Sequence, residues 1–335
     1  MRIQDFGIYP GEGKPGKNNL ITDVAGVRAG HCTIDNGNIH TGVTAVIPCE
    51  NVYETKPAAA VHVINGFGKT AGLMQVEELG NIESPIALTN TLSIHAGLEG
   101  LVRWTLNTNK DVKTFNPVCG ETNDSRINDI SSLAVNSSHV IHAIENASEI
   151  FERGAVGAGR GTVCFGLKGG IGSSSRVMNI LGRTYTIGVL VQSNFGAMKD
   201  LTVSGDPIGQ RIAKDLNGQK EEDKGSVMII LATDLPVDSR QLKRILKRCE
   251  TGLIRLGSRL GHGSGDVVIG FTTANTMGKT EGTISHEILP EHMLEQPFRM
   301  AGEAVEEAVL DSLINASATK DLQGKTVHCL REFLR

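Results

Sequence analysis

The chain has 335 residues, of which 39% are hydrophobic and 21% charged, and its net charge is −4. This balance predicts a folded globular protein and excludes a disordered one. No basic stripe stands out, which argues against nucleic acid or an anionic membrane as a partner. Glycine is enriched, at 40 residues, whereas aromatic residues make up only 4%. We therefore expect close backbone packing and glycine turns rather than large aromatic anchors.

Apolar runs and cysteines bear on where the protein resides. No apolar run approaches the ~18 residues of a membrane span, and the opening residues MRIQDFGIYPGEG contain no apolar core of a secretory signal. The six cysteines are scattered and form no C-x-x-C pair, which favours free buried thiols over a zinc site. We expect a cytoplasmic protein without a metal site.

Short runs of β-branched residues alternate with helical periodicity along the chain. Strands are predicted at 44–48, 60–64, 86–92, 163–167, 185–192, 227–233 and 267–273. Helices are predicted at 69–79, 95–106, 138–152, 239–256 and 298–316. Because strands and helices intermix, with no repeat or linker between them, we expect a single layered domain of the α/β or α+β class over 1–335.

Glycines cluster around the predicted strand 163–167. Gly157, Gly159 and Gly161 form a G-x-G-x-G pattern, and three more glycines follow at 169–172. A dinucleotide fingerprint needs G-x-G-x-x-G between a strand and a helix, whereas these glycines precede and follow a strand. Turns and close backbone approach therefore explain them better than nucleotide binding does.

The segment GHGSGD, residues 261–266, lies between a predicted helix and a predicted strand. It is not the nucleophile elbow of α/β hydrolases, which needs G-x-S-x-G between a strand and a helix. A serine at the head of a strand suits self-cleavage instead, in which Ser264 Oγ attacks the Gly263 carbonyl and the resulting ester hydrolyses. Ser264 then becomes a chain N-terminus, whose α-amine can serve as base for its own hydroxyl. An ordinary glycine-rich loop is the alternative.

Two polar residues on predicted elements are further candidates. Glu306 falls within the apolar face of the helix 298–316, where a carboxylate is costly unless it is functional or held in an ion pair. Asn194 directly follows the strand 185–192. An amide at a strand end can donate to a developing oxyanion, and a turn residue is the alternative reading of this position.

A third candidate is the polar stretch at 120–129. It packs three acidic residues and two amides into ten positions, with Glu121 and Asn123 at its start. A solvated loop is the ordinary interpretation of such a stretch. The sharper interpretation is a polar loop that holds a cationic group of a substrate.

Segments along nearly the whole chain match one family, in the same order. They are ITDVAGVRAGH (21–31), GVTAVIP (42–48), NGFGKTAG (65–72), ESPIALTNT (83–91), GETND (120–124), CFGLKGGIGSSSR (164–176), GVLVQSNFG (188–196), GHGSGD (261–266) and EEAVLDSL (306–313). On these segments the sequence resembles the L-aminopeptidase/D-esterase family, also called β-peptidyl aminopeptidases. The resemblance implies a four-layer αββα sandwich like that of N-terminal-nucleophile hydrolases, with its own connectivity.

The resemblance also implies an activity and an assembly. The chain would cleave itself into a large chain, 1–263, and a small chain, 264–335, and assemble as a homo-oligomer, typically a tetramer of processed units. The implied enzyme is a serine aminopeptidase or amidase without a metal or organic cofactor. It would release N-terminal residues from small peptides, amides or esters that carry a free amino group, through an acyl-enzyme.

Roles carry over position by position. The resemblance implies that Ser264 is the nucleophile, Asn194 stabilises the oxyanion and Glu306 orients the nucleophile. It also implies that Glu121, with Asn123 near it, contacts the amino group of the substrate.

Two departures from the family pattern bear on substrate preference, and two other functions stay open. A serine that some members place two residues before the helix glutamate is Ala304 here, and an active-site tyrosine has only Asn123 and Phe165 as nearby candidates. An acyltransferase of the same layout is one alternative, although those relatives place threonine at the cleavage point. A non-catalytic protein that binds a metabolite or nucleotide is the other.

Overall fold

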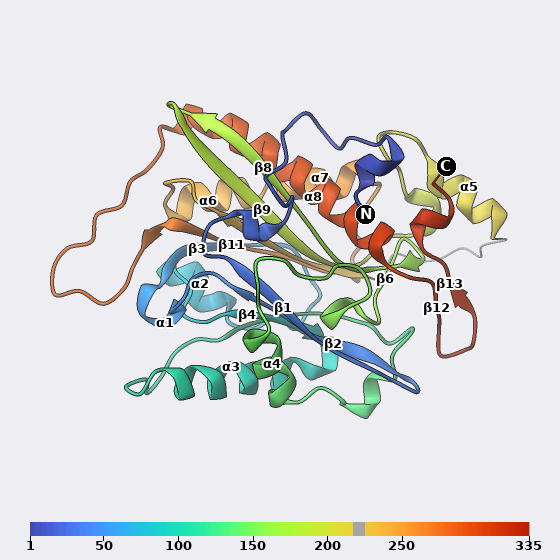
Figure 1. Ribbon diagram of the computed structural model, residues 1–335, viewed down its shortest axis with the longest axis horizontal. Helices are drawn as coiled ribbons and strands as arrows, with labels where there is room; N and C mark the ends of the chain where they lie inside the picture. The colour runs from blue at the N-terminus through green and yellow to red at the C-terminus, as the bar shows by residue number, and fades with distance from the viewer. Residues whose placement is uncertain (217–224, 335) are drawn as a thin grey trace.

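A computed structural model describes residues 1–216 and 225–334. Two β-sheets lie face to face, and helices cover the outer side of each sheet (Figure 1). One sheet has four strands in the order β1-β2-β4-β5, and the other has five in the order β3-β11-β10-β9-β8. These layers confirm the αββα sandwich that the family resemblance implied.

The four-stranded sheet is built from the first half of the chain. Its strands are β1 (Arg28–Asn36), β2 (Ile39–Ile47), β4 (Ile86–Asn90) and β5 (Val118–Thr122). Pairing is antiparallel except between β4 and β5. The outer layer consists of α3 (Ile94–Thr108) and α4 (Ser137–Glu145), and two short helices, α1 (Val52–Thr55) and α2 (Leu73–Leu79), flank β3 in the chain.

The five-stranded sheet joins one early strand to four later ones. Its strands are β3 (Pro57–Gly66), β8 (Gly170–Ile180), β9 (Arg183–Asn194), β10 (Ser226–Thr233) and β11 (Gly265–Thr276). Only β10 and β11 run parallel. Helices of this half are α5 (Ile208–Asp215), α6 (Ser239–Leu246), α7 (Cys249–Arg255) and α8 (Glu295–Asn315), and two small hairpins are β6–β7 (163–168) and β12–β13 (319–327).

Two hydrophobic cores result from this layering. One fills the space between the sheets and continues beneath α3 and α4, and the other lies between the five-stranded sheet and its helices. Strand residues alternate between them: Val267 and Ile269 of β11 pack in the first core, whereas Val268 packs in the second. Among the described residues, no helix combines the length and apolar character needed to cross a bilayer.

Glycine and serine allow α8 to lie close against β8. A Cβ atom at Gly172 would stand 1.9 Å from the Ala308 carbonyl oxygen, so only glycine permits this approach. Beside it, the Ser174 hydroxyl donates to the Ala304 carbonyl at 2.6 Å. The glycine enrichment therefore serves close backbone packing, as the composition predicted.

Most predicted elements are present, but three are interrupted. The predicted strand 163–167 is a tight hairpin, because Phe165 (φ 51°) and Gly166 (φ 70°) turn the chain between β6 and β7. The predicted helix 239–256 is two helices, α6 and α7, separated by a turn at 247–248. The predicted helix 138–152 ends at Glu145, because Ser148 pairs instead with Ala29 of β1.

Candidate active site

Three strands of the five-stranded sheet have their ends at one edge. Ser226, the first residue of β10, pairs with Asn194, the last residue of β9, and also with Gly265, the first residue of β11. Adjacent strands lie about 4.8 Å apart. Ser264, which precedes Gly265, therefore lies at the same end of the sheet as Asn194.

Ser264 is buried at the end of a tight turn. It is 1% exposed, and its backbone N–H donates to the Gly261 carbonyl at 3.0 Å. Asn65, which pairs with β11 from β3, holds this turn, because its Nδ2 donates to the carbonyl oxygens of Gly261 (3.2 Å), His262 (3.0 Å) and Ser264. Sequence reasoning missed Asn65, since only the sheet register brings it to residues 261–264.

The hydroxyl of Ser264 has a carboxylate partner that sequence reasoning also missed. Ser264 Oγ donates to Asp266 Oδ1 at 2.6 Å, and the same oxygen accepts the Val227 N–H at 3.1 Å. Residues two apart on an extended chain share one face, and this spacing was the available signal. Because Val268 packs beneath the helices, Ser264 and Asp266 face the helical layer rather than the space between the sheets.

Asn194 has one end of its amide fixed and the other available. Gln192, on the same face of β9, donates to the Thr89 carbonyl of the opposite sheet, so Asn194 also faces the space between the sheets. Its Oδ1 accepts the Val163 N–H at 2.9 Å, which fixes the orientation of the amide. Within residues 1–216 and 225–334, Nδ2 has no hydrogen-bond acceptor. Asn194 therefore presents a spare donor at the end of the sheet.

Glu121 reaches the same region from the opposite sheet. It lies in β5 and is 3% exposed, which corrects the solvated-loop interpretation of this stretch. Its Oε1 accepts the Lys69 N–H at 2.8 Å, and its Oε2 accepts the Thr91 hydroxyl. A Cβ atom at Gly68 would lie 3.2 Å from Glu121 Oε1 and 3.4 Å from the Gly265 Cα. The carboxylate and the start of β11 therefore flank the same loop residue.

Asn123 and Phe165, the two candidates near the missing tyrosine, lie differently. Asn123 is exposed, and its Oδ1 accepts the Ser125 N–H at 2.9 Å, an arrangement typical of a loop. Phe165 is fully buried, with its ring 5.1 Å from that of Phe195. The structure therefore brings Asn194, Glu121 and the backbone of Ser264 to one end of the sheets, with the Ser264 hydroxyl on the helical side, whereas Asn123 is exposed to solvent.

A buried lysine organises the glycine-rich segment beside Asn194. Lys168 Nζ donates to the carbonyl oxygens of Gly159 (3.0 Å), Thr162 (2.9 Å) and Gly169 (2.8 Å). Burial lowers the pKa of this ammonium well below its ordinary value. Because Val163, which holds the Asn194 amide, directly follows Thr162, Lys168 fixes the backbone that positions Asn194. Nothing in the residues around Lys168 indicates this role in advance.

Glu306 has a different neighbourhood. It is 1% exposed in α8, and its Oε2 accepts from Arg255 Nε at the end of α7. Burial raises the pKa of Glu306, and Arg255 opposes that rise. Among the described residues, Arg255 is the hydrogen-bonding partner of the Glu306 carboxylate, and no hydrogen bond joins Glu306 to Ser264. Its predicted role in orienting the nucleophile stays a prediction.

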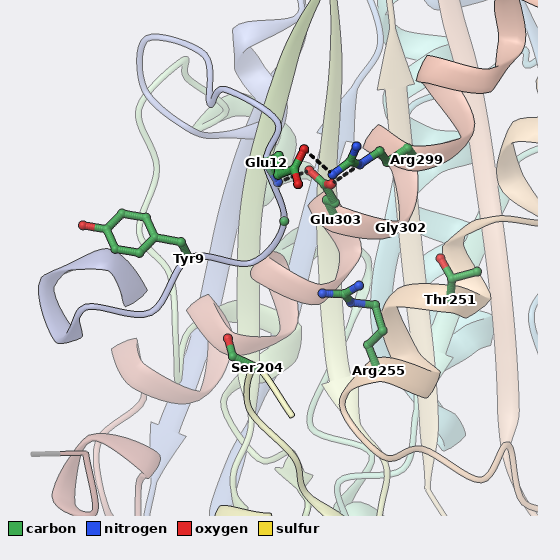
Figure 2. A pocket seen from close by; sticks show the side chains of 9 residues that line it. Tyr9, Glu12, Ser204, Thr251, Arg255, Arg299, Gly302 and Glu303 are labelled. Carbon is green, nitrogen blue, oxygen red and sulfur yellow. Dashed lines mark hydrogen bonds and ion pairs between the residues drawn. The ribbon is translucent and has the colours of Figure 1, made fainter. Parts of the chain in front are cut away.

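Arg255 also borders a cavity of about 470 Å³ in the helical layer. Figure 2 shows the Arg255 side chain at this cavity, with Arg299 joined to Glu12 and Glu303 across it. None of the predicted site residues lines the cavity. It is therefore separate from the region that contains Ser264, Asn194 and Glu121.

The helix-flanked sandwich of two sheets, with a serine at the head of a central strand, is a fold of the N-terminal-nucleophile hydrolase type. Residues 19–327 match the model of peptidase family S58. The chain belongs to this family, which confirms the resemblance found in the sequence.

Relatives of known sequence are similar over nearly their full lengths. The chain is 37% identical to a beta-peptidyl aminopeptidase of Sphingosinicella microcystinivorans, covering 98% of this chain and 89% of that protein. It is 35% identical to a beta-peptidyl aminopeptidase of Sphingosinicella xenopeptidilytica, covering 93% and 84%.

Solved structures agree in fold. A Pyrococcus horikoshii OT3 protein is 43% identical with a TM-score of 0.96, covering 100% of this chain and 98% of that one. The L-aminopeptidase D-Ala-esterase/amidase of Ochrobactrum anthropi is 33% identical with a TM-score of 0.91, covering 99% and 96%. It is described as a prototype for the serine aminopeptidases and a new variant of the N-terminal-nucleophile hydrolase fold. These relatives confirm that the chain is a hydrolase, a peptidase of the serine aminopeptidase type.

Proposed function

We propose that this chain is a precursor that cleaves itself between Gly263 and Ser264 into chains 1–263 and 264–335. One observation carries the proposal: this peptide bond closes a tight turn directly before β11, and the hydroxyl of the buried Ser264 is hydrogen-bonded to a carboxylate. β11 lies between β3 and β10 in the sheet. Sheet hydrogen bonds would therefore keep the two chains together as one unit after cleavage.

Cleavage creates the base that the mature enzyme needs. The backbone nitrogen of Ser264 becomes a free α-amine, which takes the proton of its own hydroxyl as the oxygen attacks a substrate carbonyl. The amine then protonates the leaving amine, and an ester on Ser264 remains. A water molecule, deprotonated by the same α-amine, hydrolyses this ester. Loss of the bond to Gly263 also frees Ser264 to turn toward the space between the sheets.

The proposed role of Asn194 follows from its Nδ2 donor, and that of Glu121 follows from its buried negative charge. The spare Nδ2 donor of Asn194 stabilises the tetrahedral oxyanion, a contribution typical of an amide held in advance of the reaction. The buried carboxylate of Glu121 pairs with the ammonium of a substrate and so selects peptides, amides and esters with a free amino group. Glu306 is paired with Arg255. To orient the nucleophile, Glu306 must therefore act through Arg255 or break this ion pair.

Substrate range, assembly and location complete the proposal. The two beta-peptidyl aminopeptidase relatives support β-amino acids as accepted N-terminal residues. We expect a homotetramer of processed units, measured by light scattering after size-exclusion chromatography. The buried cysteines at 119, 249 and 329 form no disulfide, which supports a reducing, cytoplasmic location that cell fractionation tests.

The activity is tested with a pair of substrates and a pair of variants. Alanine p-nitroanilide and its N-acetyl derivative differ only in the free amino group, and the proposal predicts hydrolysis of the first alone. Ser264→Ala should remain one chain and lose hydrolysis. Ser258→Ala is the control, because Ser258 lies in the same loop and its hydroxyl accepts the Leu260 N–H and makes no other hydrogen bond among the described residues. Hydrolysis by Ser264→Ala, or equal hydrolysis of both substrates, refutes the proposal.

A further inference from the structure

Self-cleavage needs a base that the mature enzyme does not supply. In the intact chain the nitrogen of Ser264 is an amide and cannot accept the proton of the attacking hydroxyl. Another group must accept it, and that group must lie within hydrogen-bond distance of Ser264 Oγ before the reaction. The α-amine that serves the mature enzyme exists only after this first step.

Asp266 meets this requirement by geometry. Its Oδ1 accepts the Ser264 hydroxyl at 2.6 Å, and the carboxylate is buried, with 2% of the residue exposed. The backbone of Asp266 pairs with Val227 on one side and Asn65 on the other. The Val227 N–H also donates to the carboxylate. The acceptor is therefore held rigidly next to the reacting oxygen.

His262 is the other titratable residue of the turn, and it is less suitable. It is exposed, and its ring lies 6.1 Å from the ring of Phe67. In the described part of the chain its ring makes no hydrogen bond to Ser264. The carbonyl of His262, rather than its side chain, takes part in the turn, by accepting from Asn65.

We propose that Asp266 is the proton acceptor for self-cleavage, an inference that rests on the proposed function. Asp266 takes the proton of Ser264 Oγ as this oxygen bonds to the Gly263 carbonyl carbon. The tetrahedral intermediate then breaks its bond to the Ser264 nitrogen, which receives the proton from Asp266. The product is an ester between Gly263 and Ser264 Oγ. Water hydrolyses it to a Gly263 carboxylate and a Ser264 with free amine and hydroxyl.

The test compares the rates at which newly made full-length chains split, followed by intact mass after cell-free synthesis. Asp266→Asn keeps the shape and the acceptor oxygen but is no base, and its cleavage should slow roughly 10²–10⁴-fold. Asp266→Glu keeps a base at a displaced position and should cleave faster than Asp266→Asn. A purely structural role predicts the reverse order, because asparagine fits the same hydrogen bonds better than glutamate.

Control variants test whether a change in the splitting rate comes from altered folding, or from His262 acting as the base instead of Asp266. Asp234→Asn removes another carboxylate, which is half-buried and accepts the Thr186 N–H at the far end of β10. This variant should leave the splitting rate unchanged. His262→Ala should also cleave normally. If Asp266→Asn fails to fold, as judged by its melting temperature, Asp266→Ser takes its place, because it also removes the base and keeps an oxygen on the side chain.

Hydroxylamine identifies the step that is blocked. It attacks esters, so it should accelerate the splitting of any chain that has reached the ester, and it should not rescue Asp266→Asn. Rescue of that variant, or splitting at the wild-type rate, refutes the role of Asp266 while the proposed function stands. A wild-type chain that never splits refutes both.

Discussion

Replacing Asn194 with aspartate keeps the oxygen that accepts the Val163 N–H at 2.9 Å and exchanges the Nδ2 donor for a negatively charged oxygen. We expect kcat/KM to fall by at least roughly 10²–10³-fold, the effect of losing one oxyanion donor. Asn194→Ala loses the acceptor as well. It leaves the Val163 N–H without its partner, which should lower the free energy of unfolding by ~1–3 kcal/mol.

Two measurements on the fully processed variants separate these effects. Hydrolysis of alanine p-nitroanilide gives kcat/KM, and urea unfolding gives stability. Both variants should lose activity to a similar extent, although only Asn194→Ala loses the acceptor of the Val163 N–H. If Asn194→Asp keeps kcat/KM within threefold of the wild type, Asn194 is not the oxyanion donor and the reasoning fails.

Three further predictions concern stability. Gly172→Ala should destabilise the protein by several kcal/mol, because its Cβ would stand 1.9 Å from a backbone oxygen of α8, whereas Gly282→Ala, with its nearest neighbour at 3.9 Å, should be neutral in thermal unfolding. Burial raises the pKa of Asp124 from 3.8 to about 6. The folded state therefore binds its proton more tightly than the unfolded chain does, and stability should fall by up to about 3 kcal/mol as the pH rises from about 4 to 6. Asp124→Asn should lose this part of the fall in urea unfolding across that range, and an unchanged pH dependence would contradict the assignment. Arg255→Gln leaves Glu306 buried without its cation and should lower the melting temperature, and adding Glu306→Gln should restore part of it. No restoration in the double variant would show that the pair is not coupled.

The apolar strands were predictable because a strand buried on both faces consists mostly of apolar residues. Residues 227–233 and 267–273 lie in strands buried on both faces, which produces continuous apolar runs. β8 was not predicted, because its buried residues include Gly172 and three serines. These residues resemble a loop in composition. Gly172 and Ser174 let α8 lie close, whereas the hydroxyls of Ser173 and Ser175 bond to the segment 16–23.

Only those parts of the candidate site that neighbouring residues in the sequence indicate could be predicted. Ser264 was selected from its glycines and its place before a strand, and Asn194 from its place after one. Glu121 was taken for a loop residue, because nothing local shows that it pairs in a parallel sheet with β4. Asn65 acts on a turn about 200 residues further along the chain, and Lys168 acts on backbone carbonyls. Neither kind of contact shows in the residue types nearby.

Intact mass under denaturing conditions shows whether the chain cleaves itself before Ser264. The account predicts two species of 263 and 72 residues, about 28 and 8 kDa of the 35.7 kDa total, with Ser264 at the N-terminus of the smaller one. Ser264→Ala should give one species of full mass. A wild-type chain that remains at 35.7 kDa, or splits at any other bond, contradicts the account.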